Sequence, residues 1–150
     1  MSEENDETFR LDSRLSWASE HVLWLGLCEL RLMNDRRWPW LLLIPQRPTI
    51  EEIHDLTPLD QAMLTFETNL AAATLKAMTG CDKINTGALG NVVPQLHIHV
   101  VARNQGDENW PGPVWGHGER RAYDVAGLEE MTEALRSAFD AATSQIRDDA

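Results

Sequence analysis

Basic residues are scarce in this sequence. Of its 150 residues, 13 are Lys or Arg and 24 are Asp or Glu, which gives a formal net charge of −11. A surface this acidic repels phosphate backbones and anionic lipids, and this argues against a nucleic-acid polymer or a membrane surface as the partner. Hydrophobic residues make up 43% of the chain, yet no apolar run reaches the roughly 20 residues that a membrane-spanning helix needs.

Cysteine is also scarce, and the N-terminus lacks a hydrophobic segment. Cys28 and Cys81 are the two cysteines and have no metal-type spacing, so we expect both to be reduced and buried. The first ten residues, MSEENDETFR, contain no apolar core of a secretory signal. We therefore expect a cytoplasmic protein with a flexible acidic tail at residues 1–10 and a single domain at residues 11–150.

Hydrophobic patterning predicts several strands. Residues 27–33 alternate between apolar and polar side chains, and residues 38–45 form a short apolar run that suits a strand buried on both faces. The polar turn at residues 34–37 between these two strands predicts a hairpin. Further strands are expected at residues 83–87 and 94–101.

Two amphipathic helices are expected, one between the strands and one after them. Thr57 can cap the first helix, Pro58 suits its first turn and Gly80 suits its end. The second helix is expected near residues 128–146. This order of elements indicates an α+β domain whose antiparallel sheet is covered on one side. Apolar residues recurring every three or four positions predict one apolar stripe on the first helix, at Leu59, Met63, Phe66, Leu70, Ala73 and Ala77.

The most informative segment is the five residues from Gln95 to His99. In a strand, side chains two residues apart share one face, so Gln95, His97 and His99 align while Leu96 and Ile98 face the core. Two aligned imidazoles are compatible with nucleophilic catalysis, with metal binding or with plain solvent exposure. A metal site needs at least one further ligand, and the remaining histidines have no spacing that points to this strand.

Residues 85–100, NTGALGNVVPQLHIHV, resemble the signature of the histidine triad (HIT) family. In that family, a His-x-His-x-His motif follows an Asn-x-Gly turn. Residues 32–48 resemble the family's ribose-binding hairpin, and the Trp- and Pro-rich residues 110–116 also fit. The resemblance covers approximately residues 11–120 and is greatest to bacterial members that carry a Gln-x-His-x-His variant of the motif.

The resemblance implies a fold, an activity and an assembly. Members are nucleotide-binding hydrolases and transferases, so we expect an α+β, HIT-like fold with an antiparallel sheet of about five strands, a long central helix and a C-terminal helix. The implied substrate is a purine nucleotide joined through its phosphate to an amine, an acyl group or a second phosphate. The resemblance also implies a homodimer with helix 58–79 near the interface and the two sheets made continuous, and it requires no metal or other cofactor.

The resemblance also implies roles for the motif residues. His97 matches the family's nucleophile, which attacks the α-phosphorus and forms a nucleotidyl-histidine that water then cleaves. This chemistry needs the neutral imidazole with its proton on the far nitrogen, held by a backbone carbonyl. His99 matches the histidine that contacts the phosphate or the leaving-group oxygen, and Gln95 stands in place of the family's first histidine.

Four further residues are candidates for nucleotide binding. Asn34 matches a ribose-binding position, Asn91 matches a phosphate-contacting position, and Asn85 matches the asparagine of the turn before the motif. Asn34 and Asn85 are equally suited to tight turns without any ligand. Arg103 is a candidate for neutralising a substrate phosphate, and it is equally compatible with a plain surface position.

The sequence departs from the family pattern at two positions. Gln95 replaces the first histidine of the motif, and Pro48 stands where many members have a further histidine. A glutamine side chain forms hydrogen bonds but carries no titratable proton. Two functions are therefore open at this stage: a nucleotide hydrolase or transferase, and a non-catalytic nucleotide-binding sensor or partner-binding module.

Overall fold

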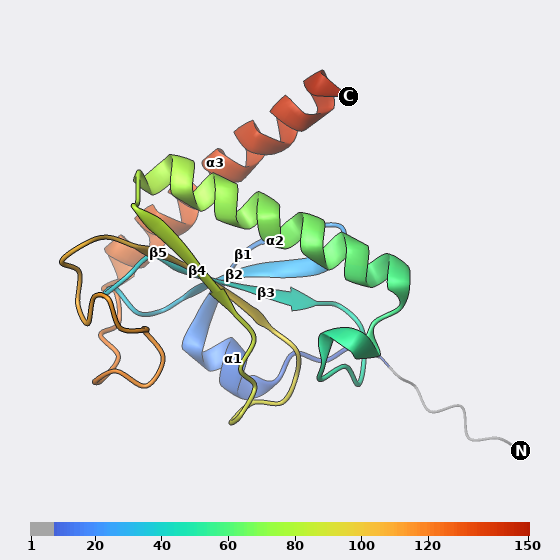
Figure 1. Ribbon diagram of the computed structural model, residues 1–150, viewed down its shortest axis with the longest axis horizontal. Helices are drawn as coiled ribbons and strands as arrows, with labels where there is room; N and C mark the ends of the chain where they lie inside the picture. Colours follow the sequence, from blue (N-terminus) through green and yellow to red (C-terminus); the bar gives the residue numbers. More distant parts are fainter. Residues whose placement is uncertain (1–7) are drawn as a thin grey trace, which may run out of the picture.

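A five-stranded antiparallel sheet organises residues 8–150, the part of the chain that the computed structural model describes (Figure 1). The strand order across the sheet is β1-β2-β3-β5-β4, and every neighbouring pair is antiparallel. The α+β class and the five-stranded antiparallel sheet are therefore confirmed. The strands are β1 (Ser19–Trp24), β2 (Cys28–Met33), β3 (Trp40–Pro45), β4 (Lys83–Gly87) and β5 (Ile98–Arg103).

The hairpin predicted around residues 34–37 is formed by β2 and β3, with Leu30 opposite Leu43. The strand predicted at 94–101 is displaced, because β5 begins only at Ile98. The backbone N–H of Leu96 donates to the carbonyl of Ile50, outside the sheet, so this stretch does not join the ladder. Helix α1 (Ser13–Ala18) and strand β1 were not expected from the sequence.

Side chains on the two faces of the sheet belong to two separate hydrophobic clusters. Along β3, Leu41 and Leu43 point to one face, while Trp40, Leu42 and Ile44 point to the other. Helices α2 (Pro58–Thr79) and α3 (Val125–Asp149) cover the first face, and α1 lies on the second (Figure 1). Both faces are thus covered, whereas the sequence indicated cover on one side.

Helix α2 begins and ends as predicted. The Thr57 hydroxyl accepts a hydrogen bond from the backbone N–H of Asp60 at 3.2 Å, and Gly80 ends the helix in the left-handed region with φ of 66°. The short 3₁₀ helix η1 (Ile53–Asp55) precedes it.

The apolar stripe predicted on α2 is not the face that this helix buries. Leu59 and Phe66 of that stripe are 72% and 53% exposed. Two of the buried positions are polar, which is why hydrophobic periodicity alone did not identify this face. The buried residues are Leu64, Glu67, Ala71, Thr74 and Leu75.

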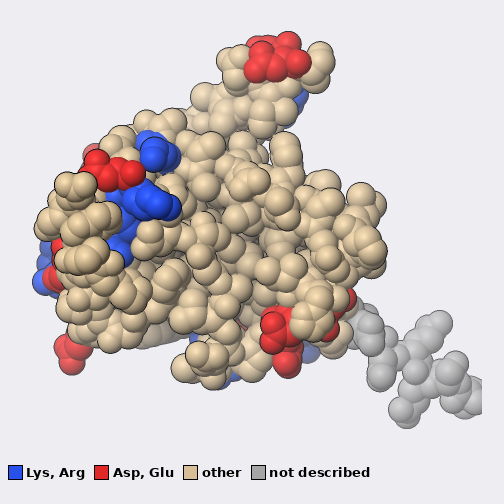
Figure 2. All heavy atoms as spheres, viewed as in Figure 1, with Lys and Arg blue, Asp and Glu red and all other residues tan. Residues whose placement is uncertain are grey.

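The end of the predicted acidic tail is part of the packed structure. Phe9 packs against the second hydrophobic cluster, and the carbonyl of Arg10 accepts a hydrogen bond from the side chain of Gln95. The rest of that prediction, residues 1–7, lies outside the described residues. Figure 2 shows that the middle of the face carrying α2 and β4 is uncharged. Acidic side chains lie at the tip of α3 and at the lower right, and basic side chains gather at the left with acidic ones beside them. Within residues 8–150, no helix combines the length and the apolar character needed to cross a bilayer.

Candidate functional site

The structure brings His97 and His99 together on the second face of the sheet. Their ring centroids lie 4.9 Å apart, and the residues are 7% and 6% exposed. His99 lies on β5 opposite Leu42 of β3, whereas His97 lies one residue before β5 begins. Two imidazoles that are this close and shielded from water can both contact the same small chemical group of a ligand.

A backbone carbonyl fixes the protonation of His97. Its Nδ1 atom lies 2.7 Å from the carbonyl oxygen of Gln95. A carbonyl can only accept, so Nδ1 of His97 carries the proton and donates it to this bond. In the neutral ring, the lone pair is then on Nε2, which is the arrangement that a nucleophilic imidazole requires.

An indole N–H fixes the protonation of His99 in the opposite sense. Nε1 of Trp40 donates to Nδ1 of His99 at 3.0 Å, so in His99 the lone pair is on Nδ1 and the proton on Nε2. Burial, and to a smaller extent the neighbouring His97, lowers the pKa of His99 to about 3. His99 is therefore a neutral hydrogen-bond donor at neutral pH.

The side chain of Gln95 bonds to the N-terminal segment and to neither imidazole. Its Oε1 accepts from the backbone N–H of Asp12 at 2.9 Å, and its Nε2 donates to the carbonyl of Arg10 at 2.8 Å. The amide is thus satisfied at both ends by backbone groups. Gln95 reaches His97 through its main-chain carbonyl and not through its side chain.

A cavity of about 290 Å³ opens beside His97. Glu51, His54, Gly90 and Gln95 are among the residues that line it, and none of the lining residues is Lys or Arg. Its volume is close to the lower end of the range for small-ligand pockets, roughly 300 Å³. A larger cavity of about 600 Å³ between α2 and α3 is lined by no histidine. The cavity beside His97 is therefore the better candidate for a catalytic site.

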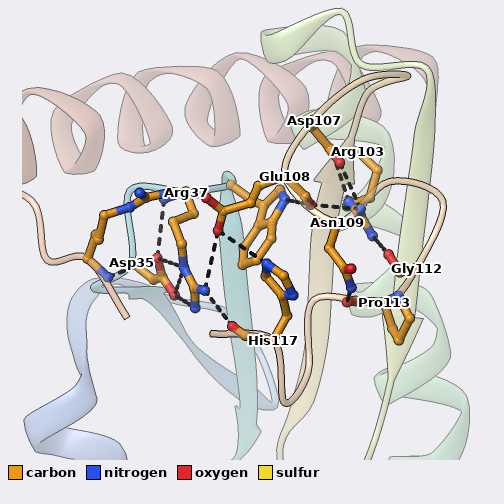
Figure 3. A network of polar contacts seen from close by, with 11 residues as sticks. Asp35, Arg37, Arg103, Asp107, Glu108, Asn109, Gly112, Pro113 and His117 are labelled. Carbon is orange, nitrogen blue, oxygen red and sulfur yellow. Dashed lines mark hydrogen bonds and ion pairs between the residues drawn. The ribbon is translucent and has the colours of Figure 1, made fainter. Parts of the chain in front are cut away.

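Arg103 is fully buried and already engaged with protein groups. Its guanidinium forms two hydrogen bonds to the carboxylate of Asp107, at 2.7 and 2.8 Å, and one to the carbonyl of Gly112 at 2.8 Å (Figure 3). The two remaining N–H groups reach Oδ1 of Asn85 and the carbonyl of Glu108, at 3.3 and 3.4 Å. All five donors of Arg103 are thus used: four hold the loop after β5, and one reaches Asn85 on β4.

The other two predicted nucleotide-binding residues are Asn34 and Asn91. Oδ1 of Asn34 accepts from the backbone N–H of Tyr123 at 2.9 Å, just before α3. Among the hydrogen bonds within residues 8–150, none links Asn34 to His97 or His99. Asn91 is exposed in the segment between β4 and β5, next to Gly90 of the cavity wall.

Three tryptophans complete the surroundings of His99. Trp40 and Trp115 contact its ring, with centroids at 5.7 and 5.5 Å. Trp38 stacks edge-on against Trp40 at 6.2 Å and donates to the carbonyl of Glu108 at 3.1 Å. The sequence did not single out Trp38 and Trp40, although both fall in the predicted strand 38–45 at a spacing of two residues, which predicts a shared face. In the structure Trp38 precedes β3, and both side chains belong to the second hydrophobic cluster.

Within residues 8–150, no group of three or more His, Cys, Asp or Glu side chains is arranged to hold a metal ion. Cys28 and Cys81 are free and buried, and burial, with smaller contributions from Glu67, raises the pKa of the Cys28 thiol. Neither cysteine lies in the histidine cluster.

Comparison with known proteins finds one matching family model and several similar solved structures. Residues 17–106 match the family model described as "HIT domain". A histidine triad protein from Sinorhizobium meliloti is 57% identical, with a TM-score of 0.85 over 87% of this chain and 97% of that chain. Histidine triad proteins from Bradyrhizobium japonicum and Marinobacter aquaeolei are 42% and 37% identical, with TM-scores of 0.85 and 0.87. These two matches cover 88% and 89% of this chain and 98% of each other chain. No curated protein matched the sequence.

Proposed function

This chain belongs to the histidine triad family, and on that premise we propose that it is a nucleotide-binding hydrolase or transferase that cleaves a bond at the α-phosphorus of a purine nucleotide. The observation that carries the proposal is the 2.7 Å hydrogen bond from Nδ1 of His97 to the carbonyl of Gln95. In the neutral ring, this bond leaves the Nε2 lone pair of the buried imidazole free for attack, beside a cavity that can take a ligand.

The proposed reaction has two steps. The Nε2 lone pair of His97 attacks the α-phosphorus, the bond from phosphorus to the leaving group breaks, and the leaving group departs with that electron pair. The resulting nucleotidyl-imidazolium keeps its Nδ1 proton, and the carbonyl of Gln95 stabilises that charge by accepting the hydrogen bond. Water then attacks phosphorus, the P–N bond returns its electrons to Nε2, and one water proton is released to solvent. A second acceptor in place of water gives a transferase.

The proposal assigns the surrounding residues different tasks. His99 donates from Nε2 to a phosphoryl oxygen, where negative charge gathers during attack. Asn91 is the candidate for a further phosphate contact, because its side chain is exposed beside the cavity wall. Asn34 can offer its amide N–H groups to a ribose hydroxyl, while its oxygen accepts from the backbone N–H of Tyr123. Asn85 and Arg103 support the site through the loop after β5.

We also propose a homodimer formed through β4 and α2. β4 is an edge strand, and an edge strand offers unpaired backbone groups to a second strand. Beside it, Thr65 and Asn69 of α2 and Thr86 of β4 line a hollow of about 260 Å³ on the face whose middle is uncharged in Figure 2. Light scattering should give twice the chain mass of 17.0 kDa. A Thr86→Pro substitution, which removes an edge N–H, should lower it to one chain.

A cytoplasmic location is part of the same proposal, because both cysteines are unpaired and buried as expected for a reducing compartment.

Trapping the covalent intermediate tests the proposed activity. The protein is mixed with a dinucleoside polyphosphate labelled at the α-phosphorus, quenched in base and examined for a labelled protein adduct. We expect an adduct in wild type and in His21→Ala, and none in His97→Ala, with turnover reduced more than about a thousandfold. His21 is a suitable control because it lies on β1 and pairs with Glu29. An adduct that persists in His97→Ala would refute the mechanism.

The same experiment addresses the non-catalytic alternative. The observation that favours a sensor or partner-binding module is Gln95, whose side chain carries no titratable proton and binds the N-terminal segment through both its oxygen and its nitrogen. AMP binding without adduct or turnover would favour that alternative. Turnover through a His97 adduct would exclude it.

A further inference from the structure

Trp40, on strand β3, donates a hydrogen bond to His99 on strand β5. Trp40 opens β3 and pairs with Val101, so it lies diagonally across the ladder from His99, which pairs with Leu42. Its Nε1–H reaches Nδ1 of His99 at 3.0 Å. Trp40 is 7% exposed and His99 is 6% exposed, so water does not compete for this hydrogen bond.

The hydrogen bond permits one tautomer of His99. An indole nitrogen donates and never accepts, so Nδ1 of His99 must hold a lone pair whenever the bond exists. The proton of the neutral ring is therefore on Nε2. His97 has the reverse arrangement, because its Nδ1 donates to a carbonyl. The two rings, 4.9 Å apart, thus carry opposite tautomers. Nε2 of His97 offers a lone pair, whereas Nε2 of His99 offers an N–H.

Trp40 is itself held in place by packing. The indole of Trp38 contacts it at 6.2 Å in an edge-on arrangement, and Trp38 is 1% exposed. The Arg37 guanidinium lies 4.5 Å from the Trp38 ring and bonds to Asp35 and to the carbonyl of His117, in the polar network of Figure 3. The tryptophan that touches His99 therefore rests on a second tryptophan that is fixed by charged groups.

We propose that Trp40 is a positioning residue that locks His99 as a neutral Nε2–H donor aimed at the reacting phosphoryl group. The inference rests on the proposed function and specifies its substrate class. A ring locked in this way donates a hydrogen bond to a phosphoryl oxygen but keeps its proton, and the side chain of Gln95 has no acidic proton to supply. The leaving group therefore departs as an anion when the P–O bond breaks, and it takes no proton from these residues. Phosphoric and carboxylic anhydrides of a nucleotide fit this site better than phosphoramidates, whose amine must be protonated before it leaves.

The tautomer of His99 can be read directly and without a substrate. In ¹⁵N-labelled wild type, we expect Nδ1 of His99 to resonate as an unprotonated nitrogen and Nε2 as a protonated one throughout pH 5–8. We also expect a through-hydrogen-bond coupling between Trp40 Nε1 and His99 Nδ1. In Trp40→Phe, both nitrogen shifts should move toward the average of the two tautomers. A protonated Nδ1 in wild type would overturn the proposal even if the variant failed to fold.

Trp115→Phe is the matched control. Trp115 also contacts His99, at 5.5 Å, but its Nε1 is buried with no hydrogen-bond partner among the described residues. This variant removes an indole N–H beside the same ring without removing the bond to Nδ1. The His99 tautomer should therefore be unchanged in Trp115→Phe. Equal tautomer shifts in the two variants would show that packing, and not the Trp40 bond, selects the tautomer.

Kinetics test the consequence for substrates. For nucleoside 5′-phosphate esters with phenolate leaving groups of increasing pKa, we expect the wild-type rate of adduct formation to fall steadily. Trp40→Phe should lower the rate for an anhydride about tenfold, the size expected for one lost hydrogen bond. A rate independent of leaving-group pKa would overturn the inference, because it means that a proton is delivered. If no substrate gives an adduct, the proposed function fails, while the nitrogen shifts still decide the role of Trp40.

Discussion

Substitution of Gln95 separates its backbone role from its side-chain role. The backbone carbonyl of Gln95 accepts from His97, the proposed nucleophile, and any residue at this position supplies that carbonyl. The side chain instead binds the N–H of Asp12 at 2.9 Å and the carbonyl of Arg10 at 2.8 Å. Gln95→Ala should therefore loosen the N-terminal segment while leaving the nucleophile in place. Gln95→His should behave similarly, because a histidine side chain does not replace both hydrogen bonds.

The magnitudes follow from the two hydrogen bonds. Each neutral hydrogen bond contributes about 0.5–1.5 kcal/mol, so the pair contributes about 1–3 kcal/mol to holding residues 10–12. Loss of the pair should raise the exchange rate of the Asp12 amide by about 5- to 150-fold. The rate of nucleotidyl transfer to His97 should change by about tenfold or less in either variant, because neither removes a group that touches the reacting atoms.

Single-turnover adduct formation and hydrogen exchange measure the two effects separately. Gln105→Ala is the control, because Gln105 is exposed in the loop after β5, and neither quantity should change in it. A loss of more than about a thousandfold in adduct formation by a folded Gln95→Ala would refute the reasoning, because it would place the side chain on the reacting atoms. Unchanged exchange at Asp12 would show that the two hydrogen bonds do not hold the segment. A gain of several thousandfold in Gln95→His would show that the wild-type site is disabled for catalysis.

Two further substitutions test the framework that carries the site. Glu67 is 3% exposed and accepts the backbone N–H groups of Leu27 and Cys28, each at 2.8 Å. Glu67→Ala leaves both donors buried and unpaired, so urea unfolding should show a loss of about 3 kcal/mol, and a loss below about 1 kcal/mol would contradict this account. Hydrogen bonding from Arg103 holds the pKa of Asp107 below its ordinary value. The pair therefore stabilises the fold fully above about pH 4, and this stabilisation is lost as the pH falls through the lowered pKa of Asp107. Asp107→Asn should cost about 3 kcal/mol at pH 7, since it leaves a buried guanidinium unpaired, and the difference from wild type should shrink below pH 4. A difference that stays constant with pH would show that the ion pair is not its source.

The resemblance seen in residues 85–100 is confirmed by the family match and by three structures that are 37% to 57% identical. The ends of α2 were also predictable, because a capping threonine and a terminating glycine act on the nearest turn of the helix. The β2–β3 hairpin followed from patterns within a few residues. In each case, the deciding interactions are local, and the local sequence contains them.

Tertiary structure decided which groups face one another. Glu67 is buried because the backbone N–H groups of Leu27 and Cys28, some 40 residues earlier, arrive beside it. Arg103 suggested a phosphate contact, but four of its five donors bond to the loop that folds back over it and the fifth reaches Asn85 on β4. The tautomer of His99 depends on Trp40, which is 59 residues away in sequence and adjacent only through the β3–β5 pairing. The sequence by itself determined the family, the main elements and the histidine pair. Only the packed structure determined the buried face of α2 and the positions of the protons on the two histidines. Hydrogen-bond partners and burial depend on chain segments that are far apart in sequence and meet only in the fold.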